Sequence, residues 1–181
     1  GIAIKRIRQE GILSRIAILD FDFHPHDGTT AYFGGDGSVF LASIHESGWF
    51  DYDDNECGWG KGYNTVRNWG IKKVIEPEEY IRIISEELIP AVREFQPEII
   101  LFLNGVDTHV DDPVVQHYLN RSISLQDDHF KKIAEILANL ALDVCDGKII
   151  VLGSGGYGSE ITAKIWIQTI ETFSRKLLKN G

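Results

Sequence analysis

Short apolar runs rich in β-branched residues alternate with helical patterns along this 181-residue chain. The runs occupy residues 15–20, 39–44, 98–103 and 148–152. Helical patterns occupy residues 2–8 and 161–178, and others begin near Pro77 and Ser124. An alternation of this kind predicts successive strand–helix units around a parallel sheet, not a helical bundle or a β-sandwich. We therefore expect one α/β domain that spans residues 1–181.

Two of the expected helices carry signals for their first turn. Pro77 fits the first helical position, where its missing N–H is no loss, and two glutamates follow it. Residues 124–127 (Ser-Leu-Gln-Asp) fit a capping box, so the next helix is expected to begin there. Residues 46–64 contain many glycines and no sustained periodicity, which predicts an ordered loop of a length that usually carries function.

The composition argues against several classes of protein. The 27 acidic and 18 basic residues give a formal charge of -9, whereas nonspecific nucleic-acid binding relies on clustered Lys and Arg. No stretch approaches the roughly 18 apolar residues of a membrane span, so we expect no membrane contact and a cytoplasmic protein, or one whose targeting segment lies outside this sequence. Cys57 and Cys145 lie far apart and form no paired motif, which argues against a disulfide framework or a cysteine zinc site.

Metal-ligand side chains follow the first apolar run, in the sequence Asp20-Phe21-Asp22-Phe23-His24. Crevices of parallel sheets lie beyond the carboxyl ends of the strands, so these side chains fall where such folds build their sites. Side chains two apart on a strand share a face, so Asp22 and His24 are expected to converge on one point. Capping or hydrogen bonding is the other interpretation of an Asp-x-His pair at a strand end.

Two later strand ends also carry chemistry. Asp107 follows the third apolar run, and a Gly-Ser-Gly-Gly-Tyr-Gly loop follows the last. Asp22, His24 and Asp107 would supply three ligands, the number that a catalytic zinc takes while leaving a position for water. Tyr157 in the glycine loop could hydrogen-bond a developing oxyanion. A phosphate cradle is the alternative for this loop, although it lacks Gly-x-Gly-x-x-Gly spacing and the Lys-Ser/Thr of a P-loop.

Taken together, these motifs resemble the histone deacetylase family of the arginase/deacetylase superfamily, including its acetoin-utilisation and acetylpolyamine-amidohydrolase branches. Three family patterns are matched in order. They are Asp-x-Asp-x-His-x-x-x-Gly-Thr at residues 20–29, Gly-x-Asp-x-x-x-(Gly/Asp)-Asp-Pro at 105–113, and Gly-Gly-Tyr at 155–157 before a helix with Ala163 and Trp166. The resemblance implies a three-layer α/β/α parallel sheet of the arginase/deacetylase type, of which this chain supplies the C-terminal portion.

The resemblance also implies roles for individual residues. Asp22, His24 and Asp107 would bind zinc, and Tyr157 would polarise the acyl carbonyl. Two structural potassium sites are implied, built from side-chain and carbonyl oxygens. The residues of the first are Asp20, Asp22, His24, Ser43 and Ile44. The residues of the second are Phe33, Asp36, Val39 and Tyr63.

The family's general base, a pair of adjacent histidines, has no counterpart in this sequence. The chain has six histidines, and no two of them are adjacent. Residues 1–4 resemble the helix that follows the family's Phe-x-Asn active-site segment, and the sequence contains no Met. We therefore expect the N-terminal half of the fold, with the base, to be supplied by a separate or excised chain.

The loop after the second apolar run departs most from the family. Its Pro-Gly-Thr-Gly sequence is replaced by an acidic aromatic stretch, in which Trp49 or Phe50 is a candidate wall of an acyl-lysine tunnel. Ordinary core packing is the alternative for both. His26 and His45 are expected to be hydrogen-bonded structural residues, and His109 would be a further ligand only if two metals were bound.

The sequence therefore favours a zinc-dependent hydrolase that removes acetyl or similar acyl groups from a lysine-like amine. One alternative is a binuclear manganese ureohydrolase, which requires Asp-x-Asp where this chain has Asp107-Thr108-His109. The other is a non-catalytic subunit that keeps the fold for assembly or regulation. Metal stoichiometry separates the two enzymes, and assay of an acetyl-lysine substrate separates the deacetylase from the subunit.

Overall fold

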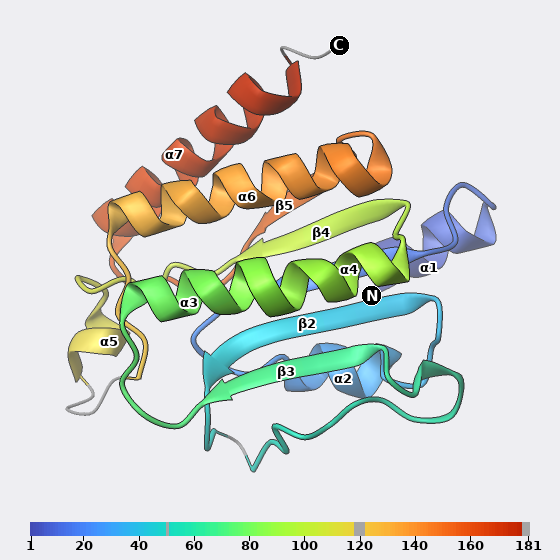
Figure 1. Ribbon diagram of the computed structural model, residues 1–181, viewed down its shortest axis with the longest axis horizontal. Helices are drawn as coiled ribbons and strands as arrows, with labels where there is room; N and C mark the ends of the chain where they lie inside the picture. The colour runs from blue at the N-terminus through green and yellow to red at the C-terminus, as the bar shows by residue number, and fades with distance from the viewer. Residues whose placement is uncertain (50, 118–121, 179–181) are drawn as a thin grey trace.

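A five-stranded sheet forms the centre of the computed structural model, which describes residues 1–49, 51–117 and 122–178 (Figure 1). The strands are β1 Ile16–Asp20, β2 Val39–Glu46, β3 Val66–Ile71, β4 Ile99–Asn104 and β5 Ile149–Gly153. They lie in the order β3-β2-β1-β4-β5, and every neighbouring pair is parallel. The α/β fold with a parallel sheet is therefore confirmed, and the four apolar runs are strands β1, β2, β4 and β5.

Helices cover both faces of this sheet (Figure 1). They are α1 Ile2–Gln9, α2 Asp27–Phe33, α3 Pro77–Ile83, α4 Ile89–Phe95, α5 Pro113–His117, α6 Asp127–Cys145 and α7 Ser159–Leu177. Ala17 and Leu19 of β1 join the core beneath α3, α4, α6 and α7, whereas Ile16 and Ile18 join the core beneath α1 and α2. This alternation gives three layers. No helix in the described ranges is long and apolar enough to cross a membrane.

The helix predicted from Pro77 extends to Phe95 with one irregular turn. Residues Ile84–Leu88 form a π-helical turn, η2, between α3 and α4. Pro90 lies in the first turn of α4 and has no N–H to donate to the preceding turn, which accounts for the local widening. The helix still buries the face that predicted it, because Tyr80, Leu88 and Val92 are fully buried.

Among the strands and α-helices, β3, α2 and the five-residue α5 were not predicted from the sequence. β3 reads Val-Arg-Asn-Trp-Gly-Ile, and only its first and last residues are buried because it is an outer strand. It therefore has no apolar run. α2 has only seven residues and carries a glycine at its second position, which gives it little intrinsic helical signal.

The start of α6 differs from the prediction by two residues. The capping box expected at residues 124–127 is wrong, because Gln126 is the N-cap and His129 completes the box. The His129 Nδ1 atom accepts the Gln126 backbone N–H at 3.0 Å. Leu125 is held in extended form by a parallel bridge to His109 and by a hydrogen bond to the Thr108 carbonyl, so the helix begins after it.

Candidate metal centre

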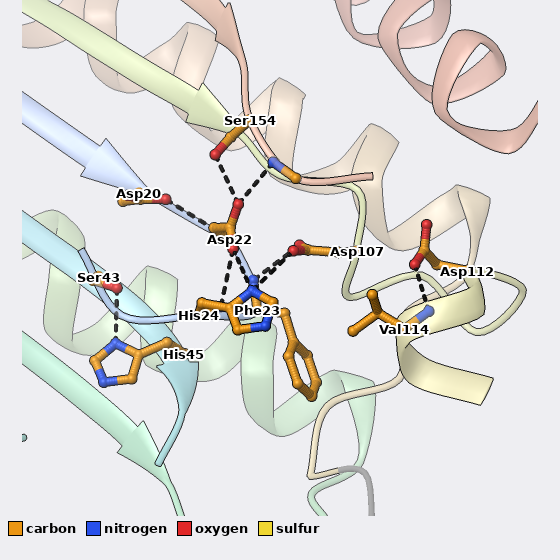
Figure 2. Close-up of polar contacts among 11 residues, drawn as sticks. Asp20, Asp22, Phe23, His24, Ser43, His45, Asp107, Asp112, Val114 and Ser154 are labelled. Carbon is orange, nitrogen blue, oxygen red and sulfur yellow. Dashed lines mark hydrogen bonds and ion pairs between the residues drawn. The ribbon is translucent and has the colours of Figure 1, made fainter. Parts of the chain in front are cut away.

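Asp22, His24 and Asp107 come together at the edge of the sheet where β1 and β4 end (Figure 2). One candidate ligand atom from each residue lies within 4.8 Å of the other two. The Nδ1 atom of His24 lies 3.1 Å from Asp22 Oδ1 and 3.5 Å from Asp107 Oδ2. The three residues predicted as zinc ligands are therefore neighbours in space.

Hydrogen bonds to carboxylates, not strand alternation, bring Asp22 and His24 together. β1 ends at Asp20, whose carboxylate accepts the Asp22 backbone N–H at 3.1 Å. The Asp22 carboxylate in turn accepts the His24 backbone N–H at 2.9 Å. Asp107 Oδ1 accepts the Phe23 backbone N–H at 2.9 Å and so ties the segment to the end of β4. The sequence predicted that Asp22 and His24 converge. The cause is this hydrogen-bonded turn and not the alternation of side chains along a strand.

The glycine loop after β5 closes the site from the other side. Asp22 Oδ2 accepts hydrogen bonds from the Ser154 hydroxyl and the Gly155 backbone N–H, both at 2.7 Å (Figure 2). A Cβ atom at Gly155 would lie 2.1 Å from Asp107 Oδ2, so only glycine allows this approach. The role of Ser154 as a donor to a ligand carboxylate was missed in the sequence, where it is one residue of a flexible-looking loop.

One oxygen of the cluster lacks a hydrogen-bond donor. Asp107 Oδ2 is buried and accepts no hydrogen bond from the described residues. Its fully buried side chain still carries a carboxylate that faces Asp22 and His24. Buried charges are normally paired or bound to a metal. A cation coordinated by this oxygen would remove the cost, and two carboxylates with one imidazole are a donor set that zinc accepts.

The electrostatics of the cluster also favour a cation. Burial raises the pKa of Asp107 to about 6, and burial together with the nearby Asp22 raises the pKa of Asp20 to about 7. The carboxylates of Asp107 and Asp22 beside its ring raise the pKa of His24 to about 9. Burial opposes ionisation of Asp22, but hydrogen bonds from His24 and Ser154 bring its pKa well below the ordinary value. A bound cation would take the place that a proton holds on His24.

Tyr157 lies on the loop that packs against this cluster, and 60% of its surface is exposed. Its backbone N–H donates to Asp112 Oδ2 at 2.7 Å, and the next N–H, of Gly158, donates to the same oxygen at 3.1 Å. Asp112 Oδ1 accepts the Val114 N–H at the start of α5 (Figure 2). Asp112 therefore holds the backbone of the loop that carries Tyr157. In the sequence, its position before Pro113 indicates only a helix cap. Burial and the nearby carboxylates raise the pKa of Tyr157.

The five residues of the first implied potassium site lie together at the ends of β1 and β2. Asp20 pairs with Ser43 in the sheet register, and Ser43 and Ile44 are fully buried. The Ser43 hydroxyl oxygen lies 2.8 Å from His45 Nδ1 (Figure 2). Asp20, only 5% exposed, brings a carboxylate into this interior position.

Three residues of the second implied potassium site, Phe33, Asp36 and Val39, lie from the end of α2 to the start of β2, and the fourth, Tyr63, follows η1 (Gly60–Gly62). The Asp36 N–H donates to the Phe33 carbonyl at 2.8 Å, and the Val39 N–H donates to the Asp36 carbonyl at 3.0 Å. The Asp36 side chain bonds Ser38 and Arg8. Tyr63 follows a glycine packed against the Asp36 backbone, and its side chain is 64% exposed.

The other histidines near the site make structural hydrogen bonds. His26 Nε2 lies 2.9 Å from Asn68 Oδ1, and His45 is held between Ser43 and Asp54. His109 Nδ1 accepts the Asp111 N–H at 3.0 Å, and its Nε2 lies 3.0 Å from Asp127 Oδ1. Both ring nitrogens of His109 are engaged, so it is not placed as a ligand for a second metal. The structural roles expected of His26 and His45 are confirmed.

The candidate tunnel wall contacts the metal cluster directly. The Trp49 ring meets the His24 ring edge to face, with a centroid separation of 4.8 Å, and lies 6.2 Å from the Phe23 ring. Trp49 is half-buried in this position. Phe50, the other candidate, lies outside the described residues.

Known proteins resemble this chain in sequence and in fold. Residues 1–173 match the family model described as the histone deacetylase domain. The chain belongs to the histone deacetylase family. It is 32% identical over 163 residues to a probable deacetylase of Archaeoglobus fulgidus. It is 34% identical over 172 residues to the acetoin utilization protein AcuC of Staphylococcus aureus strain MRSA252.

These histone deacetylase relatives are longer than this chain. The two alignments cover 88% and 92% of this chain but 43% of each relative, so the chain spans less than half of their length. The solved HDA15 HD domain superposes with a TM-score of 0.81 at 21% identity, covering 97% of this chain and 49% of that one. The histone deacetylase Clr3 superposes with a TM-score of 0.77 at 20% identity, covering 92% and 28%. Both likenesses confirm the expected fold.

Proposed function

We propose that this chain carries the zinc-binding part of a deacetylase that removes acetyl or similar acyl groups from lysine-like amines. The observation that carries the proposal is the buried Asp107 Oδ2 atom, which accepts no hydrogen bond from the described residues and faces Asp22 and His24. Membership of the histone deacetylase family supports the hydrolysis of acetyl amides. The two carboxylates and the imidazole support zinc as the metal.

Asp22, His24 and Asp107 would hold the zinc, which when bound polarises the acyl carbonyl and lowers the pKa of a bound water. Ser154 and Gly155 donate to the Asp22 oxygen and so orient this ligand. The same glycine loop leads to Tyr157.

The raised pKa of Tyr157 keeps its hydroxyl protonated at neutral pH, so the hydroxyl can donate a hydrogen bond to the developing oxyanion. Asp112 accepts hydrogen bonds from the peptide N–H groups on both sides of the Tyr157 Cα atom, which limits the movement of the ring's attachment point. Such a donor helps most when it is oriented before the reaction begins.

We infer that the general base comes from a segment outside this sequence. The family's base is a pair of adjacent histidines, and none of the six histidines here has a histidine neighbour. His26, His45 and His109 are engaged in structural hydrogen bonds. The proposed partner is therefore the N-terminal half of the deacetylase fold.

The face of the sheet around β5 is suited to that partner. β5 is an outer strand, and its Ile150 and Leu152 side chains are 42% and 41% exposed. Leu101, Leu103 and Leu152 line an apolar groove of about 240 Å³ on the side of α1 and α2. Strands of parallel sheets are normally covered on both faces, so this groove is expected to receive apolar side chains of the N-terminal half.

Potassium is proposed at both implied sites as a structural ion. The first site is supported by the buried Asp20 carboxylate, whose burial raises its pKa to about 7, beside Ser43 and Ile44. The second is supported by the closely spaced backbone of Phe33, Asp36 and Val39. The ligands implied at both sites are side-chain and carbonyl oxygens.

The alternatives differ in metal content and activity. A binuclear manganese site is disfavoured because Asp127 and Asp111 occupy both ring nitrogens of His109. A non-catalytic subunit would keep the fold and the metal without turnover. The test is to add the N-terminal half and assay a fluorogenic acetyl-lysine substrate, with Tyr157→Phe as the control. One zinc per chain and Tyr157-dependent turnover are expected, whereas a folded, zinc-loaded complex without turnover would favour the subunit.

A further inference from the structure

The loop after β2 is anchored to the sheet by one carboxylate, that of Asp54. Asp54 Oδ1 lies 3.0 Å from His45 Nε2, and Asp54 Oδ2 accepts the Ser47 hydroxyl. His45 is fully buried, and its Nδ1 atom lies 2.8 Å from the Ser43 hydroxyl. In the neutral ring Ser43 donates to Nδ1, so Nε2 carries the proton that Asp54 accepts. Both oxygens of Asp54 are therefore used to hold the loop.

Gly70 of β3 makes room for this carboxylate. His45 and Gly70 are direct partners in the β2–β3 register, and Asp54 lies over both. A Cβ atom at Gly70 would lie 2.3 Å from Asp54 Cγ. The φ angle of Gly70 is outside the left-handed region, so glycine is required for space and not for its backbone conformation.

Tyr52 is a second anchor of the same loop. Its ring packs edge to face on His45, with centroids 5.6 Å apart. Its hydroxyl lies 3.2 Å from Asn68 Oδ1 on β3 and 3.1 Å from the Thr30 hydroxyl on α2. The loop is thus fixed to two strands and a helix at Tyr52 and Asp54, and by the Ser47 hydroxyl on its β2 side.

Trp49 lies between these fixed points. Ser47 donates its backbone N–H to the Ile71 carbonyl at 3.0 Å, and the Tyr52 N–H closes a turn on the Trp49 carbonyl at 2.9 Å. From this turn the Trp49 ring reaches the His24 ring at 4.8 Å. The path from Asp54 to the metal cluster therefore consists of consecutive contacts.

We propose that Asp54 is a positioning residue: held by His45 and Ser47 over Gly70, it fixes the loop so that Trp49 packs against the His24 ring and sets its orientation. The importance of this orientation for metal binding rests on the proposed function of His24. Ser43, His45 and Asp54 are the residue types of a hydrolytic triad, but Ser43 is fully buried and no substrate can reach it. The chain of hydrogen bonds is therefore assigned to positioning.

The test follows the His24 ring by NMR in the metal-free protein, labelled at histidine. Asp54→Asn, Ser47→Ala and Gly70→Ala each disturb the anchor at a different atom. Trp49→Leu gives the reference shift for loss of the ring contact. Asp51→Asn removes a charge from the same loop at an exposed residue with φ 53°, which asparagine tolerates, and is the matched control.

The three anchor variants are expected to move the His24 ring signals toward those of Trp49→Leu, and Asp51→Asn is expected to leave them in place. Zinc affinity, measured by chelator competition, should fall by about tenfold in the anchor variants. Unchanged His24 signals in folded anchor variants would overturn the proposal, as would a Trp49→Leu variant whose His24 signals match the wild type. If Asp54→Asn does not fold, Ser47→Ala and Gly70→Ala decide. A wild-type protein that binds no zinc would instead refute the proposed function, while the NMR result still tests the anchor.

Discussion

Beyond the carboxyl ends of β1 and β4, the Asp22 carboxylate accepts hydrogen bonds from Ser154, Gly155 and His24, whereas Asp107 Oδ2 accepts none from the described residues. On β5 of the same sheet, Ile150 and Leu152 lie more than two-fifths exposed. At the metal-ligand edge one carboxylate oxygen has no hydrogen-bond donor among the described residues. On β5 the apolar side chains have no covering layer among them. A cation would coordinate that oxygen, whereas only another piece of polypeptide would cover the β5 face. The two regions can therefore be perturbed independently.

The largest effect is expected at the metal-ligand edge from Asp107→Asn. Zinc affinity should fall by more than the roughly 100-fold that loss of an outer hydrogen-bond partner costs. Without metal the stability should change little, because asparagine still accepts the Phe23 N–H and removes a buried charge, while the His24 ring loses one of its two carboxylate neighbours. Chelator competition and thermal unfolding measure both quantities. Unchanged zinc affinity would remove Asp107 from the site.

Tyr157→Phe should separate chemistry from metal binding at this edge. In the complex with the N-terminal half, kcat is expected to fall by about 10²–10³, the usual loss of one oxyanion donor. Zinc affinity should stay the same, because Tyr157 is not among the three clustered ligands. Steady-state kinetics with metal analysis makes the comparison. Full activity of the variant would assign the oxyanion to another donor.

Leu152→Asp tests the β5 face alone. Association with the N-terminal half should weaken by about tenfold or more, because burying one leucine contributes roughly 1.5–3 kcal/mol. Zinc binding by the chain should not change. Val74→Asp, at a valine that is 66% exposed and away from β5, is the matched control. Equal association of the two variants, measured by calorimetry, would place the interface elsewhere.

The smallest effect expected is a pH dependence of stability in the metal-free protein. The pKa of His24 is raised to about 9, so its stabilising contribution is complete below the ordinary value of 6.5 and is lost as the pH rises through 9. Allowing for solvent screening, the free energy of unfolding should fall by about 1–2 kcal/mol between pH 7 and 9.

Denaturant unfolding with a chelator present measures this slope, and His24→Gln should flatten it. A wild-type slope that persists in His24→Gln would mean that another group causes it. Zinc should reverse the trend, because metal ligands bind better when deprotonated.

The sequence predicted the fold best where burial produces a run or a regular spacing of apolar residues. The strands β1, β2, β4 and β5 each have a buried apolar run, and Asp22, His24 and Asp107 stand directly after two of them. β3 was not predicted because its middle residues are only half-buried. The N-cap of α6 is Gln126 and not Ser124, because a bridge between His109 and Leu125 overrides the local capping signal.

The supporting residues of the site could not be predicted because their partners are distant in sequence. Ser154 donates to a carboxylate 132 residues away, and Asp112 holds backbone 45 residues away. In the sequence alone, Gly70 indicates an interruption of a strand. In the structure it leaves the space that the Asp54 carboxylate occupies. These contacts depend on how loops meet over the sheet, and no local propensity records that.

Zinc K-edge X-ray absorption of the purified protein tests the central claim most directly. The account predicts one zinc per chain with only nitrogen and oxygen ligands, at about 2.0–2.2 Å, and loss of that signal in Asp107→Asn. Sulfur ligation at about 2.3 Å, or a second metal at about 3.5–4 Å, would contradict it.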